Sequence, residues 1–449
     1  MIKKISVKNL RAIKEQELEL APITVLYGEN GSGKSSLINA LAILKNIVLN
    51  PNQPVDAFFN LGFANFGGFE QVVFNHDRKM NIELCITSMV EDSRKATFKV
   101  ILGKSSGELL LHLEAIQEPM PLPDNNKPST PNIVKRAVNK QPSGQQPARV
   151  NKEVNSWELK LEMEVVFPYP LNQQKSSETF YQNSKFNITW NGVFAQVMST
   201  TSSPESGKIA RNLAELLNRP AEEIKQCEFV NLMRGFSKPT YSPVPLTPTV
   251  NTSDEVATII ATDPYLQDHI SFYLEKIVNH SLRVYTPPGT ATFWLKTMDK
   301  RTGISTELVN EGFGINQIVY LLAKALQKER SIVCVEEPEI HLHPKIIRNL
   351  VFALIEIVKD QQKMFVISTH SENLVSALLS AVAEHKIAPD EVACYLCRKE
   401  RTESVFRRQQ INENGQIEGG LISYMESEIA DLKSILQIKG DDEKEGGKQ

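Results

Sequence analysis

Residues 23–36 read ITVLYGENGSGKSS, and the stretch at 28–35 decides the fold. It satisfies the pattern GxxxxGK[ST] and lies between a predicted strand at 23–27 and a predicted helix at 35–49. Glycines at these spacings let backbone N–H groups turn inward around an anion, and the helix N-terminus adds partial positive charge. By chance the pattern arises in roughly one or two of a hundred chains of this length. The stretch therefore predicts a phosphate-binding loop rather than a structural glycine turn.

Two side chains of this loop have specific expected roles toward a nucleoside triphosphate. Lys34 is placed to reach the β- and γ-phosphates, and Ser35 is placed to ligate Mg²⁺. We therefore expect ATP and Mg²⁺ as cofactors. The predicted nucleotide contacts in this loop are Gly28, Glu29, Asn30, Gly31, Ser32, Gly33, Lys34, Ser35 and Ser36.

A pair of acids follows a second apolar strand, in the sequence IVCVEEPEIHLHP at 332–344. The carboxyl end of a strand is where doubly wound sheets bind ligands. Glu336 is predicted to hold Mg²⁺ through water, and Glu337 to orient and polarise the attacking water. Two acids at a strand tip can simply be solvated, but a neighbouring phosphate loop favours the catalytic interpretation.

Histidines appear at two further positions of interest. His370 ends a third apolar strand in MFVISTHSENL at 364–374, which favours contact with the γ-phosphate over a structural role. His341 and His343 have the spacing of metal ligands, but their context favours a loop that follows the acidic pair. Metal ligation there remains the weaker alternative.

The segment NEGFGINQ at 310–317 precedes a predicted helix and has glycines at alternate positions. It fits a simple turn at a helix N-terminus. Equally, it fits a site that offers backbone N–H groups and the helix dipole to an anion. The residues alone leave both interpretations open.

Composition limits the class of protein more than its function. The chain has 449 residues, 41% of them apolar and 23% charged, as in ordinary globular proteins. Its net charge of -3 gives no global attraction to nucleic acid, so composition neither supports nor excludes DNA. No signal peptide and no apolar run of about 18 residues is present, so we expect a cytoplasmic protein without membrane contact. Cys394 and Cys397 form a CxxC, which we interpret as buried strand thiols rather than as a zinc or redox site.

Strands alternate with helices after residue 330, which predicts a largely parallel sheet covered on both faces. We divide the chain into an N-terminal part at 1–85, an insertion at 86–282, a C-terminal part at 283–437 and a disordered tail at 438–449. Within the insertion, residues 117–150 are rich in Pro, Asn and Lys and predict a mobile loop. Basic residues outnumber acidic ones there, which would suit phosphate contacts, although a solvated surface loop is the favoured interpretation.

Taken in order, GENGSGKSS, EGFGINQ, VEEPEIHLHP and ISTHSENL resemble the motifs of ATPases in the ABC/SMC/RecF/OLD group. The resemblance is closest to bacterial AAA-family ATPases with an overcoming-lysogenization-defect type head. It implies an α/β fold: an ABC-type P-loop NTPase head with a parallel core sheet and flanking antiparallel strands, split by a mixed α+β insertion. It covers roughly the first 85 and the last 170 residues.

By this resemblance, Gly312, Gly314 and Asn316 form a signature motif that contacts the γ-phosphate of ATP held by the other subunit. Asn316 stands where ABC signatures usually have serine, and Glu336 stands where the Walker B motif usually has aspartate. The first departure puts the contact across subunits in doubt, whereas the second is common in this subgroup.

The resemblance also assigns roles to single residues. His370 is expected to be the switch histidine, and His343 falls at the place of the D-loop aspartate. Arg11 resembles the basic residue that such heads place near the nucleotide. Gln71 is the candidate for the Q-loop glutamine.

These motifs predict an ATPase that closes as a homodimer, or a higher even oligomer, around ATP and acts on DNA or on a separate nuclease or toxin effector. Anti-phage defence and DNA repair are roles of similar stand-alone ATPases, so they enter by analogy. A second hypothesis is a nucleotide-gated scaffold that hydrolyses ATP negligibly and binds an effector or sensor protein. A transporter subunit ranks last, because the LSGGQ form of the signature is missing. No acidic cluster of the TOPRIM nuclease type follows His370.

Overall fold

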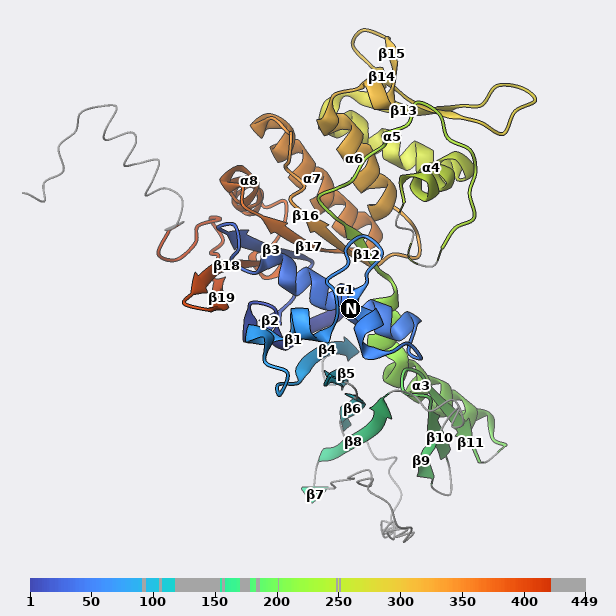
Figure 1. Cartoon of the computed structure of the whole chain (residues 1–449), viewed down its shortest axis with the longest axis vertical. Helices are drawn as coiled ribbons and strands as arrows, with labels where there is room; N and C mark the ends of the chain where they lie inside the picture. Colours follow the sequence, from blue (N-terminus) through green and yellow to red (C-terminus); the bar gives the residue numbers. More distant parts are fainter. Residues whose placement is uncertain are drawn as a thin grey trace, which may run out of the picture.

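The computed structural model describes residues 1–90, 94–104, 107–117, 154–155, 158–169, 178–182, 186–200, 202–247, 249 and 252–420. A six-stranded sheet forms its centre, and its first five strands run parallel (Figure 1). The sixth strand pairs antiparallel with the fifth. In order across the sheet, the strands are β12 (Cys227–Val230), β16 (Ile332–Glu336), β17 (Met364–Thr369), β3 (Ile23–Gly28), β18 (Val392–Glu400) and β19 (Glu403–Gln409).

A second, antiparallel sheet packs beside the first (Figure 1). Its strands are, in order, β2 (Ile13–Glu19), β1 (Ile2–Leu10), β4 (Ile82–Val90), β5 (Arg94–Leu102), β6 (Gly107–Gln117), β8 (Glu158–Tyr169) and β7 (Val154–Asn155). Two three-stranded sheets complete the described strands. They consist of β9 (Glu178–Gln182), β10 (Phe186–Trp190) and β11 (Ala195–Ser199), and of β13 (His280–Tyr285), β14 (Trp294–Asp299) and β15 (Ser305–Glu307).

Helices cover both faces of the central sheet (Figure 1). Helix α1 (Lys34–Leu49) lies between the central and the antiparallel sheets, and α3 (Pro204–Lys225) packs against it. The opposite face carries α4 (Ser253–Thr262), α5 (Pro264–Val278), α6 (Phe313–Ala325), α7 (Pro344–Gln361) and α8 (Glu372–Ala383). Short helices lie at α2 (Phe69–Val72), η1 (Val55–Phe59), η2 (Phe74–His76), η3 (Leu308–Asn310) and η4 (Pro389–Glu391).

The inner strands β16, β17 and β3 are mostly apolar because both of their faces are buried. In β17, Met364 and Val366 point into the core shared with α1, whereas Phe365 and Ile367 point into the core under α4 to α8. This alternation follows from the two-residue period of a strand. It explains why the apolar runs of the sequence predict the parallel sheet, and it confirms the predicted fold class.

The expected domain limits fall inside strands of the structure. Residue 85 lies within β4, and residue 282 lies within β13. The segment between them supplies β12 to the edge of the central sheet and most of the antiparallel sheet. Residues 86–282 are therefore continuous with both sheets, and the division into four segments stays a prediction. The expected loop at 117–150, apart from Gln117 at the end of β6, and the tail at 438–449 lie outside the described residues.

Candidate nucleotide-binding site

Three predicted motifs meet at one edge of the central sheet. The phosphate loop follows β3, the acidic pair ends β16, and His370 follows β17. In the parallel register Thr369 pairs with Tyr27, and Glu336 pairs with Ser368. The carboxyl ends of adjacent parallel strands therefore bring the three motifs together, at the position where such sheets bind ligands.

The phosphate loop is shaped by two glycines in left-handed backbone conformations. Gly28 has a φ of 150°, and a Cβ there would lie 2.0 Å from the carbonyl oxygen of Cys397. Gly33 has a φ of 94°, and a Cβ there would lie 2.3 Å from the Oγ of Ser404. Both positions thus require glycine, because the backbone of the loop runs directly against β18 and β19.

Lys34 folds back over this loop. Its side chain is 6% exposed, and its Nζ donates to the carbonyl oxygens of Gly28 at 2.7 Å and Glu29 at 2.8 Å. Burial lowers the pKa of Lys34, while neighbouring acidic groups, Glu337 among them, oppose that shift. The ammonium group is therefore held at the mouth of the loop, where an incoming phosphate would compete for its hydrogen bonds.

The loop also offers polar atoms that have no partner within the described residues. Ser32 is 1% exposed, and its Oγ is buried without a hydrogen bond. Gly33 is the N-cap of helix α1 and provides no side-chain cap, and the first turn of the helix holds no acidic residue. The first backbone N–H groups of the helix are thus not occupied by a side chain of its own first turn, as a phosphate site requires. These features fit a polyphosphate ligand.

Ser35 and Glu336, the two predicted metal ligands, contact each other. Burial raises the pKa of Glu336, and a hydrogen bond from the Ser35 hydroxyl partly opposes this rise. A hydroxyl and a carboxylate oxygen side by side are the hard donors that Mg²⁺ prefers. The donor set therefore fits Mg²⁺, with Ser35 and Glu336 as the residues that would hold it.

Glu337 is fixed at three points. Its backbone N–H donates to the carbonyl oxygen of Ser368 at 2.8 Å, and its own carbonyl oxygen accepts from Arg234 at 2.7 Å. Its carboxylate Oε1 lies 3.1 Å from Nδ1 of His370. Its φ of 45° lies in the left-handed region, which is unfavourable for a residue with a side chain. The surrounding contacts therefore have to stabilise this backbone conformation. Glu337 is 18% exposed and His370 45%, so a water molecule has access to both.

A third acid of the EEPE sequence is one that sequence analysis missed. Glu339 is 6% exposed and accepts a hydrogen bond from Thr369, the last residue of β17. Its Oε2 is buried without a partner in the described residues, and burial raises its pKa. Thr369 also accepts from the backbone N–H of Ser371 at 2.9 Å. Glu339 thus ties the end of β17, next to His370, to the turn at residues 336–339, which is called the acidic turn below.

Arg11 lies where it can influence the metal ligands. The Glu336 carboxylate opposes the desolvation that lowers the pKa of Arg11, so the two charges are close. The guanidinium carbon of Arg11 lies 4.8 Å from the centroid of the Phe66 ring. The backbone N–H of Arg11 donates to the carbonyl oxygen of Val72 at 2.6 Å. Gln71, the expected Q-loop residue, is instead occupied at the start of α2, where its Oε1 accepts from Gly68 at 3.0 Å.

The expected signature motif, Gly312 to Asn316, lies at the start of α6 and is called the signature turn below. Gly312 is the N-cap of the helix, and a Cβ there would meet nothing within 4 Å. At Gly314 a Cβ would lie 2.7 Å from Leu342 and 2.9 Å from the carbonyl oxygen of His341. Gly314 therefore lets α6 pack against the loop after the acidic pair, whereas Gly312 faces open space.

Asn316 and His343 both have hydrogen-bond partners within the subunit, and their expected roles stay predictions. Asn316 is buried, and its side-chain amide donates to Phe236 at 2.8 Å and to Leu308 at 3.1 Å. Its Oδ1 accepts from the backbone N–H of Phe236 at 2.7 Å. The Asn316 side chain is thus bound inside the subunit instead of facing a nucleotide. His343 caps α7, where its Nδ1 accepts from Lys345 at 3.3 Å.

The structure favours the plain interpretation of the cysteines. Cys394 and Cys397 lie buried in β18, and burial raises the pKa of Cys394 to about 12. Within the part of the chain that the structure describes, no group of three or more His, Cys, Asp and Glu side chains is arranged to hold a metal ion. No described helix has the length and apolar character needed to cross a membrane.

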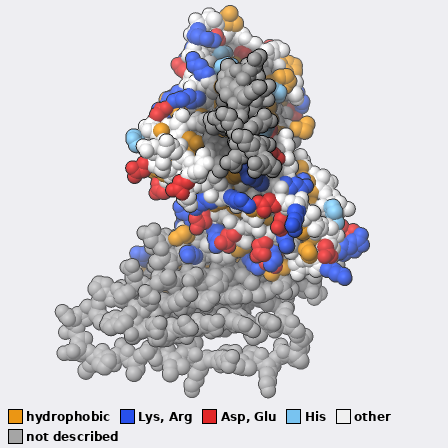
Figure 2. Space-filling model, turned by 90° about the vertical axis from the view of Figure 1, so that its left-hand side faces the viewer, with side chains coloured by type: hydrophobic (Ala, Val, Ile, Leu, Met, Phe, Trp, Pro, Cys, Tyr) orange, Lys and Arg blue, Asp and Glu red, His pale blue; other side chains and the backbone are white. Residues whose placement is uncertain are grey.

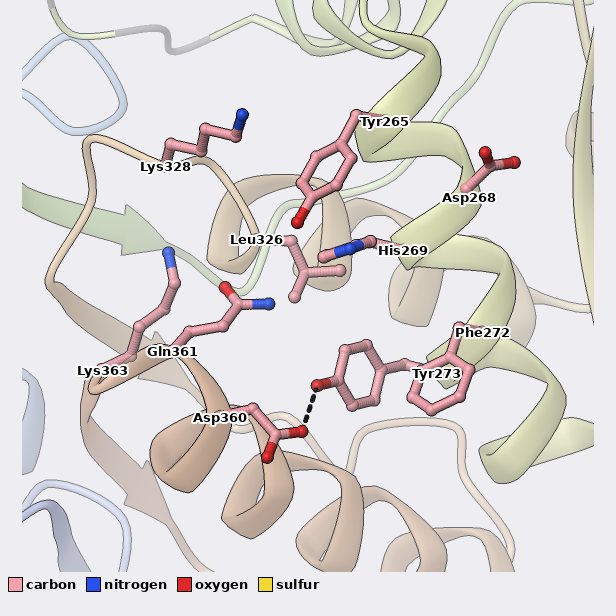
Figure 3. Close-up of a pocket in the computed structure, with 10 residues that line it drawn as sticks. All are labelled: Tyr265, Asp268, His269, Phe272, Tyr273, Leu326, Lys328, Asp360, Gln361 and Lys363. Atoms are coloured by element: carbon pink, nitrogen blue, oxygen red, sulfur yellow. Dashed lines mark hydrogen bonds between the residues drawn. The ribbon is translucent and has the colours of Figure 1, made fainter.

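A cavity of about 560 Å³ lies away from the phosphate loop (Figure 3). Its walls come from α5, from the end of α6 and from the end of α7. Lys363 on its rim precedes β17, so the cavity is at the amino ends of the parallel strands. It is therefore separate from the nucleotide site. Aromatic and charged residues share its lining, among them Tyr265, His269, Lys328 and Asp360.

Comparison with known proteins gives one family. The model of a family described as AAA ATPase domain matches residues 1–375. A search of curated proteins finds no match.

Solved structures with similarity include the SMC head domain from Thermotoga maritima, at 9% identity and a TM-score of 0.40, covering 91% of this chain and 98% of that one. A structure of the SmcHead bound to the C-winged helix domain of ScpA has 10% identity and a TM-score of 0.46, with coverages of 91% and 97%. A third, an Smc head domain with an extended coiled coil bound to the C-terminal domain of ScpA, derived from Pyrococcus furiosus, has 8% identity and a TM-score of 0.42, with coverages of 97% and 99%.

Proposed function

The chain belongs to the AAA ATPase domain family, and from that premise we propose that it hydrolyses ATP with Mg²⁺ at a site completed by a second copy of itself. The observation that carries this proposal is the convergence of Lys34, Glu337 and His370 at the carboxyl ends of three adjacent strands. Each comes from a different motif, and the charge of Glu337 acts on Lys34. A merely structural glycine turn would not need this arrangement.

In this proposal Glu337 orients and polarises the attacking water for in-line displacement at the γ-phosphate. His370 holds the carboxylate from one side and donates to the γ-phosphate. Lys34 neutralises charge on the β- and γ-phosphates after leaving its present carbonyl partners. When bound at Ser35 and Glu336, Mg²⁺ would supply further charge neutralisation of the phosphates.

The second copy is proposed from the exposed start of α6. This helix start has no side-chain cap and no acidic residue in its first turn, so its N–H groups can face an anion. Phe313, beside Gly312, is 74% exposed, which is unusual for a large apolar side chain. Both features suit a surface that a partner and its bound ATP would cover. Two copies related by a twofold axis would complete two such sites.

The cellular task that we propose is control of DNA processing or of a separate nuclease or toxin effector, in the cytoplasm, as part of anti-phage defence or DNA repair. Its support is the likeness of the motifs to stand-alone ATPases with such roles. Basic and acidic side chains are mixed over the described part of the face in Figure 2. Binding of DNA would therefore need a local basic segment rather than the whole surface.

The test compares purified wild-type protein with Lys34→Ala and Glu337→Gln in ATP binding and phosphate release. We expect Lys34→Ala to abolish binding. Glu337→Gln should bind ATP normally and hydrolyse it slower by a factor on the order of a hundred to a thousand, because the general base is lost. Equal hydrolysis by wild type and Glu337→Gln would refute the assignment of the base. Tight binding by a wild type that releases no phosphate would instead support the nucleotide-gated scaffold.

A further inference from the structure

A short segment after β12 connects the acidic turn with the signature turn of the same subunit. It comprises residues 231–236, with the sequence NLMRGF, and is called the strap below. It lies about a hundred residues before Glu336 and eighty before Asn316 in sequence, yet it bonds to both turns. No pattern in the sequence singles it out.

Within the strap, Arg234 holds the backbone of the acidic turn. Its Nη1 donates to the carbonyl oxygen of Glu336 at 2.6 Å and to that of Asn231 at 3.0 Å. Its Nη2 donates to the carbonyl oxygen of Glu337 at 2.7 Å, which also accepts from Ile340 at 3.2 Å. Burial lowers the pKa of Arg234 to about 10, so the guanidinium stays charged at neutral pH. Two charge-assisted bonds to consecutive carbonyls, made by the two ends of one planar guanidinium, hold the acidic turn in a fixed orientation.

These bonds act on the residue whose backbone is strained. Glu337 has a φ of 45°, and its carboxylate direction depends on that conformation. The backbone N–H of Glu337 is bound to Ser368 and its carbonyl oxygen to Arg234. Removing the guanidinium leaves the Glu337 carbonyl oxygen with only its weaker bond from the backbone N–H of Ile340.

The C-terminal end of the strap is bound to α6. The Asn316 amide both donates to and accepts from the backbone of Phe236. Gly235 has a φ of 120°, and a Cβ there would lie 2.8 Å from Oδ1 of Asn316. The Phe236 ring also contacts Tyr320, one turn further along the helix, at 5.6 Å between centroids. Any shift of the signature turn therefore moves the strap.

We propose that the strap positions the catalytic carboxylate of Glu337 according to the position of the signature turn, with Arg234 and Asn316 as its positioning residues. This inference rests on the proposed ATPase function. Asn316 binds the backbone of Phe236, and Gly235 joins Phe236 to Arg234, which binds the acidic turn. This continuous backbone path is the physical link that coupling between two sites needs. The site that a subunit completes for its partner would thereby influence hydrolysis in its own site.

The experiment is a double-mutant cycle on Arg234→Ala and Asn316→Ala, with ATP Kd, kcat and thermal unfolding measured for each protein. Arg234→Lys tests rescue, and Arg219→Ala is the matched control, since Arg219 pairs with Glu223 on α3 outside the site. We expect Arg234→Ala to keep the ATP Kd within about twofold and to lower kcat by about tenfold to a hundredfold, because a misplaced base costs rate rather than binding. Arg234→Lys should recover part of kcat, and Arg219→Ala should behave as wild type.

The coupling is tested by the double variant. If both residues act along one path, kcat of Arg234→Ala/Asn316→Ala stays within about twofold of Arg234→Ala alone. Losses that multiply would overturn the coupling, as would an Arg234→Ala protein with unchanged kcat, or one whose ATP affinity falls as much as its kcat. If Arg234→Ala does not fold, the same criteria apply to Arg234→Lys. A wild type without ATPase activity would refute the proposed function and this inference with it. An active wild type whose losses of kcat multiply in the double variant would refute the inference alone.

Discussion

The Nδ1 atom of His370 lies 3.1 Å from Oε1 of Glu337, so the ends of two neighbouring strands share one contact at the proposed reaction centre. The imidazole lies against the carboxylate that we propose directs water, and 45% of the His370 side chain remains exposed. Glu339 accepts a hydrogen bond from Thr369, the last residue of β17, and thereby fixes the backbone directly before His370. The carboxylate of Glu337, our proposed base, is thus held on one side by His370, and both side chains remain partly accessible to solvent.

From this contact we predict that His370→Ala lowers kcat by about tenfold to a hundredfold while the ATP Kd changes less than about threefold, because orientation of the base is lost and the phosphate loop is untouched. His370→Gln, which retains a side-chain N–H donor, should lie between the two. Steady-state phosphate release and equilibrium nucleotide binding measure both quantities. An unchanged kcat in His370→Ala would contradict the role of the histidine.

A second prediction concerns the metal. Because Ser35 bonds to Glu336, we expect Ser35→Ala to raise the Mg²⁺ concentration for half-maximal hydrolysis by about tenfold, the effect usual for loss of a ligand or its supporting group. Ser35→Thr keeps the hydroxyl, which the loop pattern allows, and should need nearly the same Mg²⁺ as wild type. A magnesium titration of the initial rate separates the two. Identical titration curves for Ser35→Ala and wild type would remove Ser35 from the metal site.

The sequence predicts those parts of the site that depend on local pattern. The phosphate loop, the acidic pair and His370 each follow an apolar strand, so the rule that ligands bind at the carboxyl ends of parallel strands is enough to bring them together. The central strands were recognisable because burial on both faces leaves continuous apolar runs.

The remaining features depend on contacts between residues far apart in the chain. Arg234 reaches the acidic turn across 102 positions, and nothing in NLMRGF indicates it. Asn316 matches the place of a signature residue, but packing of the strap against α6 binds its amide inside the subunit. Gln71 likewise closes a local helix turn. Motif position predicts where a backbone goes more reliably than where a side chain points.

A third prediction concerns DNA and the basic stretch at 127–152, which lies outside the described residues. If the protein binds duplex DNA through this stretch, changing Lys135, Arg136, Lys140 and Arg149 to Ala should weaken binding similarly on unrelated sequences. It should also flatten the dependence of affinity on salt, because phosphate contacts carry little sequence information. ATPase activity without DNA should survive. If DNA binding over the salt titration is unchanged in the quadruple variant, the interpretation of this stretch as a solvated surface loop is favoured instead.

The central claim is that each site combines the phosphate loop of one copy with the signature turn of another, and a mixing experiment tests it most directly. Lys34→Ala destroys the loop, and Gly312→Asp blocks the turn. A side chain at Gly312 meets nothing within 4 Å in its own subunit, and Asp is favourable at a helix N-cap, so Gly312→Asp should fold normally.

Each variant alone should be inactive. Equal amounts of the two, allowed to exchange subunits, should regain about a quarter of wild-type ATPase activity, because half of the twofold dimers then hold one intact site. Subunit exchange is checked independently by differently tagged chains. Heterodimers that demonstrably form and yet show no recovered hydrolysis would contradict the composite site.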